Sequence, residues 1–234
     1  MSNLTFIRFE TRGHVFCVPD DAKVVRGLRA VYDEIWRKKD YERWNLKGKV
    51  VVDIGAYYGE SCVFFLEQGA KRVIAYEPYV GAHFVLTNCL LNNVGFDPGN
   101  SDCEVYQAPV LGDAKMVHYD PADVNVAVTS FLETHNEHSV EIKAWSLDEI
   151  YQYLVKDGIK AEQCVLKLDC EGGEHAIFAS ATDAAILQFR KIMMEVHGDK
   201  KDLEGRLSSL GYNIDVEPAL ESPWLLYAWR TGRE

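Results

Sequence analysis

The sequence predicts an α/β fold in which a mainly parallel sheet is doubly wound by helices. From residue 49 onward, apolar strand-like runs alternate with helical segments over short links, the order that builds a parallel sheet with right-handed crossovers. Two of these strands run straight into glycine turns that open helices. The last two strands are joined only by residues 217–223. That link is too short for a helical crossover, so we expect an antiparallel C-terminal hairpin.

Length and charge narrow the class of protein. The 234 residues allow one large domain or two small ones, and a hydrophobic content of 47% predicts a sizeable buried core. Lys and Arg number 25 against 36 Asp and Glu, which gives a net charge of −11. Phosphate-dominated binding needs clustered cations, and the best basic run, Arg37-Lys38-Lys39, lies among acids and fits a solvated helix face. Nucleic acid is therefore a disfavoured partner.

The cysteines and the chain start point to a reducing compartment. No cysteine pair has the C-x-x-C spacing of a zinc site, so we expect small, reduced core residues rather than a disulfide framework. The N-terminus lacks the basic and apolar regions of a secretory signal. No apolar segment approaches the roughly 20 residues of a membrane span. We therefore expect a cytoplasmic protein. The six cysteines are Cys17, Cys62, Cys89, Cys103, Cys164 and Cys170.

Residues 1–45 predict a small cap on the main domain. Strand-like runs at 4–9 and 14–18 flank Thr11-Arg12-Gly13, which indicates a hairpin. Asp20-Asp21 then forms a helix start signal before a helically spaced apolar stripe. This segment is too small to bury a core of its own. The stripe consists of Val24, Leu28, Val31 and Ile35.

Residues 46–234 predict the main domain. We expect strands at 49–54, 72–77, 103–108, 164–169, 191–197, 212–216 and 224–229. Helices are expected through residues 62–66 and over 81–93, 174–181 and 203–210. The less regular stretch 113–146 is interpreted as an insertion that walls the substrate side, or as an ordinary hairpin with surface histidines. Its mixed aromatic and polar residues are Tyr119, Ser130, Phe131, His135, His138 and Trp145.

The sharpest local signal is the strand and glycine turn from Val51 to Ser61. Gly55 and Gly59 permit positive φ and a close approach of the backbone to a ligand. Glu77 ends the next strand some twenty residues on and is followed by Pro78. An acid at that place suits two vicinal ribose hydroxyls. The pattern predicts an adenosine-type cofactor site.

Two details separate this turn from a nicotinamide dinucleotide site. The spacing is G-x-x-x-G and lacks the third glycine of G-x-G-x-x-G. Asp53 and Glu60 also flank the turn, and a pyrophosphate tolerates little negative charge there. A cationic, phosphate-free ligand such as S-adenosylmethionine, with its sulfonium and ammonium groups, fits these acids better. The alternative is that both acids cap a helix and the glycines only permit tight packing.

A second acidic motif follows the strand that ends at Asp169. In a doubly wound sheet this strand should lie beside the first, with Asp169 in the crevice at the strand ends. Glu171 and Glu174 then follow around a glycine pair, either in the site or as favourable helix N-terminal acids. Glu195 and His197 share one strand face. If their strand neighbours that of Asp169, the three side chains converge.

Such a cluster has three interpretations. It can supply a general base, because histidine titrates near neutral pH. It can bind a divalent metal such as Mg²⁺ that polarises a substrate hydroxyl, although no residue is assigned as a metal ligand. It can also be a satisfied ion pair that fixes the strand ends.

With both motifs in view, the chain resembles the FkbM-type family of S-adenosylmethionine-dependent methyltransferases over roughly residues 49–197. The resemblance implies a Rossmann-like fold and O-methylation of hydroxyls on sugars, polyketides or other secondary metabolites. It implies that residues 53–61 hold the methionine part, Glu77 the ribose, and residues 107–110 the adenine edge. The shared features are Val52-Asp53-Ile54-Gly55-Ala56, Gly59-Glu60, Tyr76-Glu77-Pro78, Asn88 with Asn92-Asn93, Lys167-Leu168-Asp169-Cys170-Glu171-Gly172, Glu174 and Glu195-Val196-His197.

The resulting hypothesis is a methyltransferase that O-methylates a small molecule or glycan. Direct displacement at the methyl carbon needs positioning above all, with Asp169, His197 or Glu195 as the catalytic group that handles the hydroxyl proton. The predicted cofactor-binding residues are Asp53, Gly55, Ala56, Tyr57, Gly59, Glu60, Ser61, Glu77, Pro78, Val110, Asp169, Glu171 and Glu174.

Three alternatives remain open. A nucleic-acid methyltransferase would need a basic groove, which the charge balance disfavours. A nicotinamide-dependent oxidoreductase is disfavoured by the missing third glycine. A non-catalytic adenosyl-ligand-binding protein would bind the cofactor without transferring its methyl group. No membrane partner is expected, and the oligomeric state is open, with a dimer among the alternatives.

Overall fold

The computed structural model describes residues 5–79, 82–92, 96–97, 100–119, 139–217 and 223–231. The chain divides into two compact units, an N-terminal unit of residues 1–107 and a C-terminal unit of residues 108–234. The two glycine turns that the sequence analysis singled out, after Ile54 and after Asp169, fall in different units.

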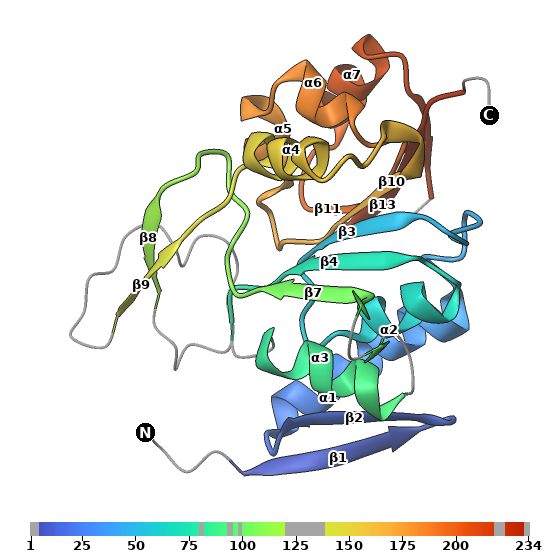
Figure 1. Cartoon of the computed structure of the whole chain (residues 1–234), viewed down its shortest axis with the longest axis vertical. Coiled ribbons are helices and arrows are strands. Elements are labelled where there is room, and N and C mark those ends of the chain that lie inside the picture. The colour runs from blue at the N-terminus through green and yellow to red at the C-terminus, as the bar shows by residue number, and fades with distance from the viewer. Residues whose placement is uncertain are drawn as a thin grey trace. The chain divides into compact units, whose positions relative to one another are not determined.

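The N-terminal unit begins with a hairpin and a helix and continues as alternating strands and helices (Figure 1). Its elements are β1 (Phe6–Thr11), β2 (His14–Pro19), α1 (Ala22–Tyr32), the π-helical segment η1 (Asp33–Lys38), β3 (Val50–Ile54), α2 (Glu60–Glu67), β4 (Arg72–Tyr76), α3 (Ala82–Leu91), β5 (Phe96–Asp97), β6 (Asn100–Ser101) and β7 (Cys103–Tyr106).

Strands β3, β4 and β7 pair in parallel, with β4 in the middle. Every residue of β3 is buried, as is every residue of β4 after Arg72. Such unbroken burial explains why both strands read as continuous apolar runs rather than as alternating patterns. Helices α2 and α3 lie between these strands and the hairpin (Figure 1), so the helices and their strands share one core.

The predicted N-terminal hairpin and helix are present. Strands β1 and β2 pair antiparallel around Arg12 and Gly13, both of which have positive φ, as a tight two-residue hairpin turn requires. Asp21 caps α1 by accepting hydrogen bonds from the backbone N–H groups of Lys23 (2.6 Å) and Val24 (3.3 Å). The Asp20-Asp21 signal therefore marks the helix start correctly, to within one residue.

The hairpin is fastened to α3 by two asparagine side chains. Asn88 Oδ1 accepts from the Cys17 N–H at 2.6 Å, and Asn92 Oδ1 accepts from the Val15 N–H at 2.8 Å. Asn88 Nδ2 also donates to the carbonyl of Tyr58 at 2.8 Å. One buried amide thus joins β2, α3 and the glycine turn.

The C-terminal unit contains the other predicted strands and four helices on one side of them (Figure 1). Its elements are β8 (Met116–Tyr119), β9 (Val140–Lys143), α4 (Leu147–Lys156), the 3₁₀ turn η3 (Ala161–Gln163), β10 (Cys164–Leu168), α5 (Glu174–Ser180), α6 (Asp183–Leu187), β11 (Lys191–Val196), α7 (Lys201–Ser209), β12 (Asn213–Val216) and β13 (Trp224–Trp229).

Strand pairing in this unit confirms the C-terminal prediction. β10 and β11 are parallel, whereas β13 pairs antiparallel with both β11 and β12. Together with the parallel β3, β4 and β7, this confirms the predicted fold class, a Rossmann-like, mainly parallel α/β fold with an N-terminal hairpin and helix. Helix α4 was missed in the sequence, although Ser146 and Glu149 form a capping box at its start, a readable S-x-x-E signal.

The predicted insertion, residues 113–146, is described only at its two ends. These ends form the antiparallel pair β8–β9, in which Tyr119 is buried. Trp145 makes a single parallel bridge to Val110. Ser130, Phe131, His135 and His138 lie outside the described residues. The interpretation of 113–146 as a wall of the substrate side therefore stays a prediction.

All six cysteines are free thiols, as expected. Cys62, Cys89, Cys103 and Cys164 are buried, whereas Cys17 and Cys170 are partly exposed. No helix within the described ranges has the length and apolarity needed to cross a bilayer.

Gly59 is a point where close packing limits the sequence. Its φ is +93°, and a Cβ added to it would lie 2.9 Å from the Val85 Cα in α3. Gly59→Ala should therefore lower the free energy of unfolding by about 2 to 4 kcal/mol, the sum of backbone strain and overpacking. Urea denaturation followed by circular dichroism measures this loss.

Gly205 supplies the matched control. It lies in α7 with nothing within 4 Å of an added Cβ. Gly205→Ala should raise stability by up to about 1 kcal/mol, because alanine favours a helix. Equal effects of the two substitutions would contradict the packing role of Gly59.

Candidate functional site

The N-terminal unit brings the predicted glycine turn and the end of β4 together. Strand β3 ends at Ile54, and the turn runs to Glu60, where α2 starts. Within it Gly55, Tyr57 and Gly59 have φ of 82°, 49° and 93°. The N–H groups of Gly55 (2.9 Å) and Ala56 (3.3 Å) both donate to the carbonyl of Tyr76. The turn is therefore tied by its backbone to the last residue of β4.

Glu77 lies against this turn, as the cofactor prediction requires. Its Oε2 accepts a hydrogen bond from the Tyr57 N–H at 2.9 Å, and its Oε1 accepts one from the Tyr79 N–H at 2.9 Å. The side chain is 5% exposed. Both carboxylate oxygens are therefore engaged by backbone N–H groups beside the glycine turn. Pro78 follows it and is partly exposed.

Asp53 and Glu60 support the turn from the inside. Both are fully buried. Asp53 Oδ2 accepts from Ser61 Oγ at 2.5 Å and from Cys62 Sγ at 3.3 Å, while Glu60 Oε2 accepts from the Tyr58 N–H at 3.1 Å. These contacts are those of residues that hold a turn and a helix start in shape. Their negative charges also surround the turn backbone, where they favour a cation.

Tyr57 and Tyr58 are the largest side chains of the turn. Tyr58 is buried, and its ring meets that of Tyr57 edge-on at 4.5 Å. A Cβ added to Gly27 of α1 would lie 2.9 Å from the Tyr57 hydroxyl oxygen, so this hydroxyl lies against the helix. Burial, aided by the nearby Glu60 carboxylate, raises the pKa of both phenols. Both therefore stay neutral at physiological pH.

In the C-terminal unit, the strands that end at Leu168 and Val196 are neighbours. Leu168 pairs with Met194 in the parallel ladder of β10 and β11, so the condition for Asp169, Glu195 and His197 to converge is met. After β10 the chain turns through Glu171 and Gly172, both with positive φ. Glu174 Oε1 accepts from the N–H groups of Cys170 (3.1 Å) and Gly172 (3.3 Å). A buried carboxylate therefore organises the second glycine turn.

His197 lies among three carboxylates. Its Nδ1 is 3.3 Å from Glu174 Oε1, and its Nε2 is 3.5 Å from Glu171 Oε2 and 3.9 Å from Glu195 Oε1. Glu195 and His197 thus share a strand face, as predicted. Asp169 lies 3.8 Å from the buried ammonium of Lys167. The turn residues Glu171 and Glu174 therefore provide the two shortest of these carboxylate contacts of His197.

These contacts decide the charge of His197. Its hydrogen bond to Glu174 is the main cause that raises the pKa of His197 to about 9, with Glu171 and Glu195 adding to the effect against burial. Burial opposes ionisation of Glu174, but hydrogen bonds from His197 and backbone N–H groups lower its pKa overall. At neutral pH the pair is imidazolium and carboxylate. His197 must lose its proton before it can act as a base.

A metal gains no support from this unit. Among the residues that the structure describes, no group of three or more His, Cys, Asp and Glu side chains is arranged to hold a metal ion. An imidazole ligates a metal only in its neutral form, and His197 is protonated at neutral pH. The Mg²⁺ interpretation therefore stays unsupported.

Some site-forming residues were not identified in the sequence. Lys167, 2% exposed beside Asp169, could have been found as the one charged residue in an apolar strand. Gly27 and the backbone donor of Tyr79 carry no sequence signal, because their roles depend on contacts with residues far along the chain. Val110, predicted to border the cofactor, is buried in the C-terminal unit, and its role stays a prediction.

The protonation of His197 can be tested directly. We expect a wild-type His197 pKa of about 9, and Glu174→Gln should move it toward 6.5, because the amide keeps its acceptor oxygen but loses its charge. Imidazole chemical shifts followed by NMR across pH 5 to 10 measure it. Glu204→Gln, which removes a carboxylate from the helix pair with Lys200, should change nothing.

The same shift predicts a dependence of stability on pH. The folded pKa of His197 lies above its ordinary value of 6.5, so its stabilising contribution is complete below pH 6.5 and is lost as pH rises through about 9. The wild type should therefore lose stability over this interval more steeply than His197→Gln. Parallel curves for both proteins would show that the ion pair does not form.

The family model described as the methyltransferase FkbM domain matches residues 53–218 of this chain. No curated protein matches the chain. The match begins at Asp53 in β3, so it includes both acidic turns, Glu195 of β11 and His197 directly after it.

Solved structures match this chain at low identity. A SAM-dependent methyltransferase from Agrobacterium tumefaciens is 8% identical, with 98% of this chain and 72% of that chain covered and a TM-score of 0.50. A putative SAM-dependent methyltransferase from Streptococcus mutans is 8% identical. The match covers 97% of this chain and 56% of that chain, with a TM-score of 0.49. TrmK of M. capricolum, solved with S-adenosylhomocysteine, is 12% identical. The match covers 83% of this chain and 68% of that chain, with a TM-score of 0.48. At 8% identity and a TM-score of 0.50, the first of these likenesses is one of fold alone.

Proposed function

This chain belongs to the FkbM methyltransferase family, and from that membership we propose that it transfers a methyl group from S-adenosylmethionine to a hydroxyl oxygen of a small molecule or glycan. The observation that carries the cofactor part is the Glu77 carboxylate, 2.9 Å from the backbone N–H of Tyr57 in the glycine turn. An acid at the second strand end thus lies directly at a turn with three positive φ angles.

The charges of the turn fit this cofactor better than they fit a dinucleotide. Asp53, Glu60 and Glu77 are buried around a turn whose residues 53–61 include no Lys or Arg. A pyrophosphate there would meet like charge, whereas a sulfonium and an ammonium would be attracted. A carboxylate at the end of the second strand suits the two vicinal hydroxyls of a ribose.

When bound, S-adenosylmethionine supplies an electrophilic methyl carbon, and the reaction forms an oxygen–carbon bond as the carbon–sulfur bond breaks. The acceptor hydroxyl loses a proton, for which this chain needs an acceptor. Asp169 and Glu195 are the candidates, since His197 already carries a proton at neutral pH. The ammonium of Lys167, 3.8 Å from Asp169 Oδ2, attracts that carboxylate and fixes its position. The Glu171 and Glu174 contacts of His197 fix the shape of the second turn.

The cofactor assignment is tested by calorimetric titration with S-adenosylmethionine and S-adenosylhomocysteine. Glu77→Gln keeps an oxygen for the Tyr57 N–H but loses the charged acceptor of two ribose donors. It should weaken both ligands by about 10- to 100-fold. Glu42→Ala, an exposed acid paired with Lys39, should bind as the wild type does.

Two outcomes would contradict the assignment. A folded wild type that binds neither ligand would return the glycine turn to a packing role. Equal binding by Glu77→Gln would remove Glu77 from the ribose contact. Circular dichroism of each variant shows that the fold is intact.

The transfer step is tested with labelled S-adenosylmethionine and a panel of hydroxylated sugars and aromatic metabolites. For an accepted substrate, Asp169→Asn should lower kcat by about 100-fold or more while cofactor affinity stays near the wild-type value. Asp199→Asn removes an exposed acid of the same unit and should leave kcat unchanged. Cofactor binding without transfer to any hydroxyl would favour the non-catalytic alternative.

A further inference from the structure

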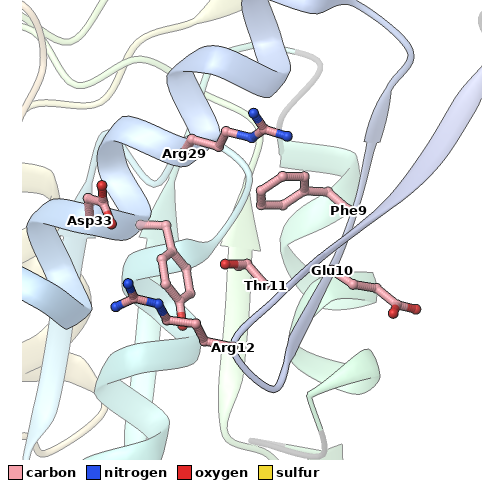
Figure 2. Close-up of a pocket in the computed structure, with 7 residues that line it drawn as sticks. Phe9, Glu10, Thr11, Arg12, Arg29 and Asp33 are labelled. Carbon is pink, nitrogen blue, oxygen red and sulfur yellow. The ribbon is translucent and has the colours of Figure 1, made fainter.

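A cavity of about 320 Å³ lies between the end of β1 and the C-terminal half of α1 (Figure 2). Its walls include Phe9, Thr11 and Arg12 of the hairpin and Arg29 and Tyr32 of the helix. All of these residues precede residue 53, where the family match begins. The cavity is therefore a feature of the N-terminal segment that the family model does not cover.

This cavity is separate from the glycine turn. The turn meets α1 at Gly27, where the Tyr57 hydroxyl lies. Arg29 follows two residues later, and two steps of an α-helix rotate by about 200°. Arg29 therefore points to the opposite side of α1, and the cavity opens on a face that the turn does not use.

The two arginines of the cavity form no ion pair within the described part of the chain. Neither Arg12 nor Arg29 has an ion-pair partner among the described residues, and the described contact of Arg29 is with the ring of Phe9, 5.4 Å from its centroid. Figure 2 shows the Arg29 guanidinium above Thr11 and the Arg12 guanidinium to its left. They come from different elements, so the fold brings two cations to one hollow surface.

Two acids, Glu10 and Asp33, also line the cavity. Figure 2 shows the Glu10 side chain pointing away from the other labelled residues. Asp33 lies 3.6 Å from Arg37 Nη1, one turn along the chain. The lining residues thus include two arginines and two acids, with Glu10 turned away and Asp33 beside Arg37.

We propose that this cavity binds a small phosphate monoester, with Arg12 and Arg29 holding the dianion. A guanidinium presents paired N–H donors that match phosphate oxygens, and two such groups suit a doubly charged tetrahedral anion better than one carboxylate. The Thr11 hydroxyl adds a donor. The half-buried Phe9 ring and the Tyr32 side chain supply a wall for the esterified group. The volume lies at the lower end of small-molecule sites, about 300 to 1,000 Å³.

The test titrates the full chain with phenyl phosphate, inorganic phosphate and phenol in a calorimeter at low salt. We expect saturable 1:1 binding of phenyl phosphate, at least about tenfold weaker binding of inorganic phosphate, and none of phenol. Arg12→Gln and Arg29→Gln should each weaken phenyl phosphate by about tenfold or more. Arg29→Lys, which keeps the charge and loses the paired donors, should give an intermediate loss.

Arg26→Gln is the matched control, because Arg26 is an exposed arginine of the same helix that does not line the cavity. It should bind phenyl phosphate within twofold of the wild type. An equal loss in Arg26→Gln, or no saturable binding by the wild type, would overturn the proposal. Equal affinity for inorganic phosphate would overturn its ester part and assign the cavity to the free anion.

The proposal is independent of the cofactor assignment. Saturation with S-adenosylhomocysteine should leave phenyl phosphate binding unchanged, and the arginine variants should bind S-adenosylhomocysteine as the wild type does. Competition between the two ligands would place phenyl phosphate at the glycine turn and contradict a separate site. Thermal unfolding of each variant shows that the hairpin is intact.

Discussion

The buried amide of Asn88 is the interaction on which the N-terminal unit depends. Its oxygen accepts from the Cys17 N–H, and its nitrogen donates to the carbonyls of Cys17 (3.2 Å) and Tyr58 (2.8 Å). A buried polar group is stable only when its hydrogen bonds are made. Helix α3 therefore fixes the hairpin on one side and the glycine turn on the other. A change in one of these elements is transmitted to the other through a single side chain.

Both acidic turns use the same construction. Glu77, at the end of β4, accepts the Tyr57 N–H of the first turn, and Glu174 accepts the Cys170 N–H of the second. Charge-assisted bonds of this kind offset the cost of burial. The two turns differ in what balances the negative charge. Glu174 has the imidazolium of His197, whereas the first turn keeps several buried carboxylates, an environment that attracts a cation.

Much of this arrangement is readable in the sequence. Unbroken apolar runs predict β3 and β10, and the glycines that follow predict the turns, because few other residues adopt positive φ. The Asp21 cap and the C-terminal hairpin follow from equally local signals. The adjacency of β10 and β11 was only a condition in the sequence analysis, and the structure supplies it.

What could not be predicted depends on contacts between distant residues. Strand periodicity placed Glu195 beside His197, but the contacts of Glu171 and Glu174 arise from a left-handed backbone turn at Glu171, a conformation that glutamate seldom adopts. The protonated state of His197 follows from those contacts and was therefore missed. The Tyr57 hydroxyl packs against Gly27, thirty positions earlier in the chain. Such a contact between two different elements leaves no spacing pattern in the sequence.

The attachment of β2 to α3 has a consequence for biosynthesis. The two asparagine contacts join residues separated by 71 and 77 positions. At ribosomal rates of about 5 to 20 residues per second, the hairpin waits roughly 4 to 15 seconds before its partners are made. During that interval the edges of β1 and β2 have no native cover from α3, and Phe6, 49% exposed even in the finished fold, adds an apolar surface. The hairpin is thus open to non-native pairing until α3 has been made.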